Sequence, residues 1–291
     1  MTKSWDIRGK RVLITGRTNG IGLAAAEELS KLGAELVIVA RNQARAGEAV
    51  RRIERATGPD ASVDVLDADL SSQASVRRLA ANVLDRYPRL DVLVNNAGAM
   101  YSPRQITEDG VELTWAVNHL APFLLTNLLL DRLVQSAPAR IVTTSSDAHH
   151  GSRIPFDDLD AERSYRAFRR YGQTKLANIL FTSELARRVE GSGVTANCFH
   201  PGLVATRFNH NNGPLMSMAM LFLRPFSRTA TKGAETLVWL VSSPDAADEQ
   251  GGYFVDERRV TPSSAARDPD AARRLWEISE AQAGTSAGRR R

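Results

Sequence analysis

Residues 11–22 read RVLITGRTNGIG, in which an apolar run leads into a turn with three glycines, and an amphipathic stretch over residues 21–32 follows. The run from Arg11 to Thr15 has the length and composition of a buried strand, and the apolar spacing after the turn predicts a helix. Glycines at positions 16, 20 and 22 allow the backbone to approach a pyrophosphate, whose charge the free N–H groups and positive dipole end of the helix stabilise. The stretch therefore predicts a dinucleotide-binding strand–turn–helix unit. The alternative is a tight turn whose glycines serve no ligand.

Short apolar runs alternate with longer amphipathic stretches along the rest of the chain, which is typical of parallel strands connected by helices. We expect further strands at Glu35 to Ala40, Ser62 to Asp67, Leu90 to Asn95, Arg140 to Thr144, Val194 to Phe199 and Gly252 to Val255. We expect helices at Ile21 to Leu32, Gln43 to Thr57, Ser72 to Arg86, Gly110 to Gln135, Tyr165 to Val189 and Thr229 to Ser242. Because no Pro/Gly/Ser-rich linker divides the chain, the prediction is an α/β fold. It is a single doubly wound Rossmann domain over residues 1–291, with its core at about 8–260 and a seven-stranded parallel sheet flanked by helices.

Two segments interrupt the alternation, residues 147–164 and residues 203–228. Both follow predicted strands at the carboxyl edge of the sheet, where doubly wound folds bind ligands, so we expect them to frame a substrate pocket. The second contains PLMSMAMLFL at residues 214–223, whose methionines suit an irregular apolar ligand; this stretch is interpreted as a substrate lid or, alternatively, as an interface with a subunit or a membrane. Residues 261–291 are predicted to form a helix, Asp268 to Ala283, followed by a frayed tail.

The composition excludes a collagen-like, a low-complexity and a wholly disordered chain. The chain has 291 residues, of which 43% are hydrophobic and 24% charged, as in ordinary globular proteins. It has a single cysteine, Cys198, and no signal-peptide layout at its N-terminus, so we expect a cytoplasmic protein without an internal disulfide. Its longest apolar stretches fall short of the roughly 18 residues that a transmembrane helix needs, and no such helix is expected.

The charge of the chain argues against nucleic acid as a partner, and the spacing of its histidines argues against a metal ion. The net charge of +5 is small for this length, and Arg163, Arg166, Arg169 and Arg170 are interpreted as a solvated helix face, with a nucleic-acid patch as the alternative. The five histidines show no ligand spacing, so no metal site is predicted. A serine hydrolase is also excluded, since no G-x-S-x-G turn surrounds Ser146.

The end of the second predicted strand indicates which dinucleotide is bound. An NAD site places Asp or Glu there to bond the adenosine ribose, whereas this chain has Arg41 and Asn42. Arg41 can bind a 2′-phosphate, and Arg17 in the glycine turn can approach the same phosphate from the other side. We therefore predict NADP(H) as the cofactor.

Further motifs follow the glycine turn in order. They are Asp69-Leu70, Asn95-Asn96-Ala97-Gly98, Asn118, Ser145-Ser146, Tyr171 with Lys175, and Pro201-Gly202 with Thr206. Together these motifs resemble the short-chain dehydrogenases/reductases of the classical type, over nearly the whole chain. Residues 117–120, 123–126, 175–181 and 253–256 are similar to the retinol dehydrogenase and WW-domain oxidoreductase-like branch of that family.

The spacing of Tyr171 and Lys175 predicts proton transfer independently of the resemblance. Four residues apart on one helix, the two side chains project from the same face, one turn apart. A neighbouring ammonium and an oxidised nicotinamide both favour the phenolate. The phenol can then act as general acid when a carbonyl is reduced and as general base when an alcohol is oxidised. The alternative is an exposed tyrosine and lysine without a role.

Ser146, at the end of the fifth predicted strand, offers a hydroxyl to the substrate oxygen, and strand alternation lets only one of Ser145 and Ser146 face the site. The resemblance selects Ser146. It also implies that Asn118 holds a water in a proton relay to Lys175, whose ammonium bonds the nicotinamide ribose; a locally bonded asparagine is the alternative. The cofactor site that it implies consists of Gly16, Arg17, Asn19, Gly20, Ile21, Gly22, Arg41, Asn42, Asp69, Leu70, Asn95, Ala97, Gly98, Tyr171, Lys175, Pro201, Gly202, Val204 and Thr206. Within it, Asn95 and Gly98 shape the adenosine-ribose side, Asp69 accepts from the adenine amino group and Thr206 bonds the carboxamide.

The sequence thus predicts an NADP-dependent oxidoreductase that transfers a hydride between the nicotinamide and an apolar alcohol or carbonyl compound, retinoid-like, long-chain or ring-bearing. The alternative is a dinucleotide-binding regulator without turnover, which has no need of a tuned phenol. The resemblance also implies a homodimer or homotetramer. The substrate, the direction of the reaction and its stereochemistry stay open at this stage.

Overall fold

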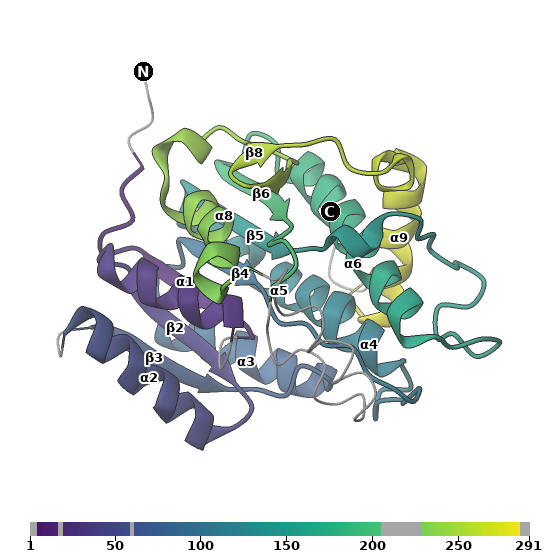
Figure 1. Cartoon of the computed structure of the whole chain (residues 1–291), viewed down its shortest axis with the longest axis horizontal. Coiled ribbons are helices and arrows are strands. Elements are labelled where there is room, and N and C mark those ends of the chain that lie inside the picture. Colours follow the sequence, from purple (N-terminus) through teal and green to yellow (C-terminus); the bar gives the residue numbers. More distant parts are fainter. Residues whose placement is uncertain (1–4, 17–19, 59–60, 205–227, 286–291) are drawn as a thin grey trace.

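One sheet runs through the protein from β3 at one edge to β8 at the other (Figure 1). The computed structural model describes residues 5–16, 20–58, 61–204 and 228–285. The strands are β1 (Arg11–Ile14), β2 (Glu35–Ala40), β3 (Val63–Asp67), β4 (Val92–Asn95), β5 (Ala139–Thr144), β6 (Val194–Phe199), β7 (Tyr253–Val255) and β8 (Arg258–Arg259). β1 to β7 pair in parallel, as predicted, and β8 pairs antiparallel with β7. The predicted count of seven strands is one short, because β8 consists of two exposed arginines that give no apolar signal.

Helices cover both faces of the sheet. α1 (Gly20–Lys31), α2 (Gln43–Thr57) and α8 (Ala230–Ser242) pack on one face, while α3 (Gln73–Arg86), α5 (Ala121–Gln135), α6 (Ala167–Arg188) and α9 (Pro269–Gln282) belong to the layer on the other face. Successive residues of a strand point to opposite faces. Val12 and Ile14 therefore contribute to the apolar cluster under α1 and α8, and Leu13 contributes to the cluster under α3, α5 and α6.

The order β3-β2-β1-β4-β5-β6-β7-β8 places a reversal of direction between β1 and β4. The chain runs outward from β1 to β3 and then returns to β4 on the other side of β1. Loops that leave the carboxyl ends of two such strands diverge, and the crevice between them is where open α/β sheets bind ligands. The glycine turn after β1 and the Asn95–Gly98 motif after β4 both lie at this crevice.

The helix predicted over residues 110–135 is interrupted. α4 (Leu113–Trp115) leads into a π-helical turn, Ala116–Leu120, before α5 begins. π-Helical turns are frequent at functional sites, and Asn118 lies in the middle of this one.

Leu113–Gln135 is the one helical stretch, among the described residues, that is long and apolar enough to cross a membrane. However, 78% of its apolar window is buried inside the fold, which is the arrangement of a core helix. Its apolar composition is therefore accounted for by contacts within the protein.

The helix predicted at Asp268 to Ala283 is found as α9, with the Asp268 side chain as its N-cap. Trp276 of α9 stacks on Phe181 of α6, with ring centroids 5.8 Å apart, and meets Phe123 of α5 edge-on at 4.9 Å. α9 therefore covers apolar side chains of both helices. The last part of the predicted frayed tail, residues 286–291, lies outside the described residues.

Candidate active site

The glycine turn after β1 packs directly against the chain after β4. Gly16 has a φ of +70°, and a Cβ at this position would lie 2.3 Å from the Cα of Ala97, so only glycine fits without moving the backbone. The side-chain amide of Asn96 fastens the contact by donating to the carbonyl oxygens of Thr15 (3.1 Å) and Gly16 (2.9 Å). Sequence reasoning did not single out Asn96, although it stands inside the Asn95–Gly98 motif.

α1 begins beside this turn. Its first residues are Gly20, with a φ of +63°, then Ile21 and Gly22, so the N–H groups of its first turn are available to an anion. A glycine-rich backbone cradle at a helix N-terminus fits a pyrophosphate. Arg17 and Asn19, which were also predicted to bind the cofactor, lie outside the described residues.

Arg41 follows β2 and is largely exposed, with its Nη1 3.6 Å from Oδ2 of Asp69 after β3. Burial opposes the ionisation of Asp69, but hydrogen bonds from Ser71 and the Arg41 charge outweigh it and lower the pKa of the carboxyl. The side chain of Asn42 caps α2 by accepting from the Arg45 N–H (3.0 Å). The structure thus brings Arg41 and Asp69 together where the adenosine end of a dinucleotide is predicted.

Two predicted cofactor residues face the protein interior. Asn95 is 2% exposed, and its side-chain amide donates to the hydroxyl of Thr126 in α5 (2.9 Å). The Asn95 side chain is thus engaged inside the protein, and that Asn95 shapes the adenosine-ribose side stays a prediction. Leu70 lines a small pocket with Val111 and Leu124.

The hydroxyl of Ser146, just after β5, hydrogen-bonds the phenol of Tyr171 in α6. Ser145 is turned away, because its hydroxyl donates to the backbone carbonyl of Lys175 (2.8 Å). This is the alternation expected for two neighbouring residues at a strand end. Burial raises the pKa of Tyr171 to about 12, against the effect of the Ser146 hydrogen bond. The protein alone therefore keeps the phenol protonated at neutral pH.

Lys175 is buried one helical turn from Tyr171. Its Nζ lies 5.3 Å from the centroid of the tyrosine ring and donates to the Thr144 carbonyl (3.1 Å). Burial lowers the pKa of Lys175 to about 8. A Cβ on Gly98 would lie 3.3 Å from this Nζ and 3.5 Å from Oδ1 of Asn118. Residues predicted from three separate motifs therefore meet at one place.

Asn118 is fully buried, and its side chain joins the loop after β4 to α6. Its amide nitrogen donates to the Ala99 carbonyl (2.8 Å) and the Thr174 hydroxyl (3.1 Å), and its Oδ1 accepts from the Ala99 N–H (2.8 Å). These partners are 19 and 56 residues away along the chain, so Asn118 is bonded between elements and not locally within its own helical run. A relay water held by Asn118 stays a prediction.

Residues 10–215 match the family model for the short chain dehydrogenases. The chain belongs to the short chain dehydrogenase family. It is 44% identical to retinol dehydrogenase 14 of Mus musculus over 290 residues, which cover 96% of this chain and 87% of the relative. It is 43% identical over 287 residues to DnrU of Streptomyces sp. (strain C5), named as a candidate daunorubicin C-13 ketoreductase; the match covers 98% of this chain and 96% of that protein.

A solved structure agrees with this assignment. Pseudomonas aeruginosa RhlG, in an active-site complex with NADP, has the same fold with a TM-score of 0.68 and 27% identity, over 87% of this chain and 97% of that chain. With the sequence relatives, it confirms the predicted family, and the relatives confirm the retinol dehydrogenase-like branch.

In this family member, the Ser146 loop is held from two sides. A Cβ on Gly172 would lie 2.4 Å from the Ala148 carbonyl oxygen, so glycine lets the loop approach α6 closely. On the other side, Nε2 of His149 accepts from the Ser263 N–H (3.2 Å), which leaves Nδ1 as the protonated nitrogen that donates to the Ser146 carbonyl (2.8 Å). Burial lowers the pKa of His149 and so favours this neutral form. Neither Gly172 nor His149 was predicted, since no sequence motif marks this packing.

The chain after β6 includes the predicted residues Pro201, Gly202 and Val204. Gly202 has a φ of +82°, and Val204 forms a bridge with Arg228 that joins the two ends of the predicted substrate loop. Thr206 and the methionine-rich stretch at residues 214–223 lie outside the described residues.

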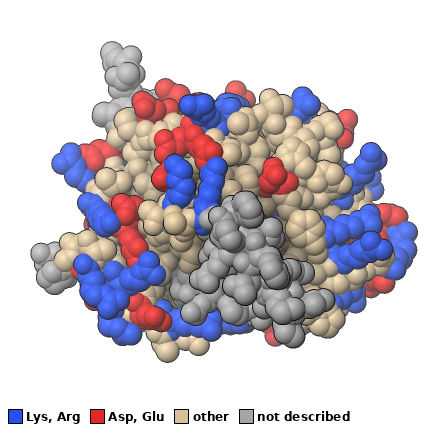
Figure 2. Space-filling model, in the orientation of Figure 1, with Lys and Arg blue, Asp and Glu red and all other residues tan. Residues whose placement is uncertain are grey.

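Basic and acidic side chains are interspersed over most of the face shown in Figure 2. Of the arginines interpreted as a solvated helix face, Arg163 is exposed and pairs with Asp157, and Arg166 and Arg169 are exposed. The prediction is wrong for Arg170, which is buried and paired with Glu112.

In the part of the chain that the structure describes, no three His, Cys, Asp or Glu side chains cluster to form a metal site.

Proposed function

We propose that this short chain dehydrogenase is an NADP(H)-dependent oxidoreductase that interconverts an apolar alcohol and the corresponding aldehyde or ketone. The observation that carries the proposal is the meeting of Ser146, Tyr171 and Lys175 at the carboxyl edge of the sheet. This edge also holds the Gly16 turn, whose close approach to Ala97 leaves a cradle suited to a dinucleotide.

The preference for NADP(H) is supported by Arg41, an exposed guanidinium at the end of β2 where an NAD site would have a carboxylate. Planar guanidinium groups bind phosphate oxygens through paired hydrogen bonds. The NADP complex of RhlG, which shares the fold, agrees with this choice.

Ser146, Tyr171 and Lys175 would each have a separate role in the reduction of a carbonyl substrate. The bound cofactor supplies the hydride, and the Ser146 hydroxyl donates to the substrate carbonyl oxygen and holds it beside the phenol. Tyr171 gives its proton to that oxygen as negative charge develops there. The Lys175 ammonium stabilises the phenolate that remains, and the same groups run in reverse for alcohol oxidation.

The proposed substrate is apolar, and either a retinoid-like, a long-chain or a ring-bearing compound. Two relatives support these compound classes. One is named for retinol, an apolar alcohol, and the other for reduction of the C-13 ketone of daunorubicin, a ring-bearing compound. We therefore include both compound classes in the test below.

A regulator that binds dinucleotide without turnover is the second candidate. Such a protein needs the cradle at Gly16 but not a hydrogen-bonded Ser146–Tyr171 pair beside a buried lysine. The complete set of catalytic groups favours the enzyme.

A rate screen tests the proposal. Purified protein is assayed with NADPH and with NADH against retinal, long-chain and aromatic aldehydes, steroid ketones, quinones and daunorubicin, and with NADP⁺ against the matching alcohols. We expect turnover of at least one bulky apolar carbonyl, with a higher kcat/KM for NADPH than for NADH. Tight NADPH binding by fluorescence without turnover of any compound would favour the regulator.

A cytoplasmic location and a homodimeric or homotetrameric state belong to the same proposal. Because α9 covers side chains of α5 and α6, a second copy would have to pack outside α9 or on another face. Light scattering of the purified chain measures the oligomeric state, and cell fractionation measures the location.

A further inference from the structure

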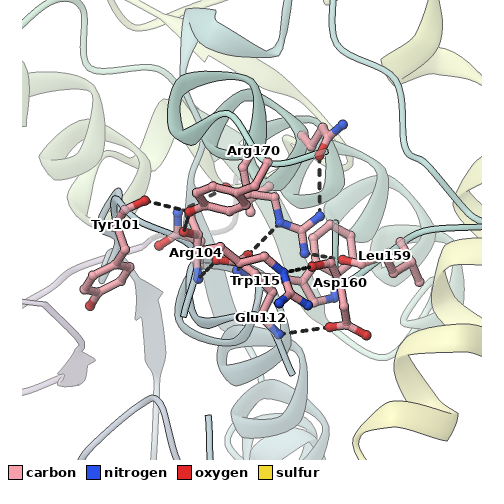
Figure 3. A network of polar contacts seen from close by, with 12 residues as sticks. Tyr101, Arg104, Glu112, Trp115, Leu159, Asp160 and Arg170 are labelled. Atoms are coloured by element: carbon pink, nitrogen blue, oxygen red, sulfur yellow. Dashed lines mark hydrogen bonds and ion pairs between the residues drawn. The ribbon is translucent and has the colours of Figure 1, made fainter. Parts of the chain in front are cut away.

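A buried ion pair involves the residue that precedes Tyr171 in α6, and the proposed proton transfer does not use it. Nε of Arg170, the residue before Tyr171, lies 2.6 Å from Oε2 of Glu112. The two side chains are 1% and 0% exposed. Figure 3 shows the pair at the centre of a polar network that joins the chain after β4, the segment before α6, and α6 itself.

The Glu112 end of the pair fixes the helical run that carries Asn118. Its carboxylate accepts hydrogen bonds from the N–H groups of Thr114 (2.8 Å) and Trp115 (3.0 Å), which makes it the N-cap of α4. Its own N–H donates to Asp160 (2.9 Å). The carboxylate is thus held in one position by backbone groups of the run that leads into the π-helical turn.

The Arg170 end is held equally firmly. Its guanidinium lies over the Trp115 ring, 4.7 Å from the centroid, and it also donates to the Leu159 carbonyl and to Gln173 Oε1. The start of α6 is therefore attached both to α4 and to the segment before α6. The planar guanidinium group of Arg170, with its five N–H donors, can make these several directional contacts at once.

A second contact joins the same two elements one turn further along α6, where Asn118 donates to the Thr174 hydroxyl (3.1 Å). Tyr171 lies between the two contacts in sequence. With both in place, α6 has a fixed rotation and height relative to the Asn118 turn. Without the Glu112–Arg170 ion pair, the start of α6 loses its charged contact with the segment that leads into the Asn118 turn. Lys175 and Gly172 still hold α6 to β5 and to the Ser146 loop, but the phenol can then shift relative to Ser146.

Simple stabilisation is a weak explanation for the pair. Apolar residues of similar volume often hold buried elements together as well as an ion pair does, because burying two charges is costly. A guanidinium–carboxylate contact differs from apolar packing in its defined distance and direction. This difference matters next to a group whose position limits the reaction.

We propose that Glu112 and Arg170 form a positioning pair that sets the place of the Tyr171 phenol relative to Ser146. The inference rests on the proposed function, because it concerns proton transfer by Tyr171. Neither residue contacts the reacting atoms, so both act through the elements that they join.

The test uses the double variant Glu112→Gln/Arg170→Met, which removes both charges together and leaves no unpaired buried charge. A shift of about 1 Å at a reacting group can cost about 10²-fold in rate, so we expect kcat to fall by about that factor while the Kd for NADPH is unchanged. Arg170→Lys, which keeps the charge but loses the fork, is expected to retain an intermediate kcat. The matched control is Glu184→Gln, which alters another buried carboxylate of α6, paired with Arg187 and Arg188, and should leave kcat unchanged. A folded double variant with wild-type kcat would overturn the proposal.

A readout that does not depend on turnover separates this inference from the proposed function. Crystal structures of the wild type and the double variant are superposed on the sheet strands. We expect the Ser146–Tyr171 hydrogen bond to be broken in the variant and kept in the Glu184→Gln control. An unchanged Ser146–Tyr171 geometry contradicts the positioning role, whatever the activity. A wild type that binds NADPH but reduces no carbonyl contradicts only the proposed function.

Discussion

Nζ of Lys175 lies 5.3 Å from the centre of the Tyr171 ring, and burial shifts the pKa values of the two groups in opposite directions, up to about 12 for the phenol and down to about 8 for the ammonium. Both shifts favour the neutral forms, as expected for groups removed from water. Because a phenolate and an ammonium attract each other, each charged form is more favourable when the other group is charged. The pair suits a reaction in which the phenol loses its proton only while the substrate oxygen takes it up.

Tyr171→Phe is expected to abolish turnover and to leave the Kd for NADPH within about twofold of wild type, because the phenol transfers a proton and general acid–base catalysis contributes about 10²–10⁴-fold or more. Steady-state rates and a fluorescence titration of NADPH measure the two effects. Tyr87→Phe is the control, since that phenol donates to Oδ2 of Asp64 in β3 (2.7 Å), away from the proposed reaction path. Activity within threefold of wild type in Tyr171→Phe would remove Tyr171 from the mechanism.

Arg41→Asp is expected to shift cofactor preference from NADPH toward NADH, because it removes a phosphate ligand and supplies a carboxylate that can bond a 2′-hydroxyl. The new carboxylate would also lie near Asp69, and the two negative charges together would repel a 2′-phosphate. The ratio of kcat/KM for the two cofactors measures the effect, and Arg51→Asp on the exposed surface of α2 controls for the change in net charge. If both variants keep the wild-type ratio, Arg41 is an ordinary surface residue.

The sequence predicts those parts of the site that depend on local periodicity. The four-residue spacing of Tyr171 and Lys175 decides that they share a helix face, and strand alternation decides that Ser145 and Ser146 point in opposite directions. The seven parallel strands were likewise predicted to within two residues at each end, because most are short, largely apolar runs between turn signals.

Arg170 shows where local patterns fail. It stands among exposed arginines, and the local pattern predicts one solvated helix face for all of them. In the structure Arg170 is buried, while its neighbour Phe168 is 67% exposed. A buried arginine requires a partner, and the partner, Glu112, is 58 residues away along the chain. Only the packing of α4 against α6 brings the two together.

Gly172→Ala is expected to lower the free energy of unfolding by about 1–3 kcal/mol and to reduce kcat, although alanine is the better helix former. The added Cβ would lie 2.4 Å from the Ala148 carbonyl oxygen and 2.5 Å from the Ser152 hydroxyl, so the loop that carries Ser146 has to move away from α6. Urea denaturation and steady-state kinetics measure the two effects. Gly47→Ala in α2 is the matched control, because its Cβ would meet only the end of the Arg51 side chain at 3.4 Å, and it should stabilise the protein by about 1 kcal/mol. Equal effects of the two substitutions would show that the contact with Ala148 relaxes without cost.

His119 is expected to make the protein less stable in acid. It is fully buried between Trp115, with ring centroids 4.6 Å apart, and Ser279 of α9, whose hydroxyl lies 2.8 Å from Nε2. Burial lowers its pKa from 6.5 to about 3. Between these values the unfolded chain binds a proton that the folded protein does not, so the free energy of unfolding falls as the pH falls, by up to about 1.4 kcal/mol per pH unit from this residue.

His119→Gln removes the titrating group but keeps a polar side chain able to bond Ser279, so its stability should depend less on pH than that of the wild type. Urea denaturation at about pH 7.5 and about pH 5 gives the four free energies needed, and the wild type should lose more than the variant by about 1–2 kcal/mol. Burial also lowers the pKa values of His149 and His200, so part of the acid sensitivity should persist in the variant. His150→Gln, at a side chain that is 54% exposed, controls for the loss of a histidine as such. Equal losses in wild type and His119→Gln would mean that His119 titrates alike in the folded and unfolded states, and that its buried position under α9 opens readily to water.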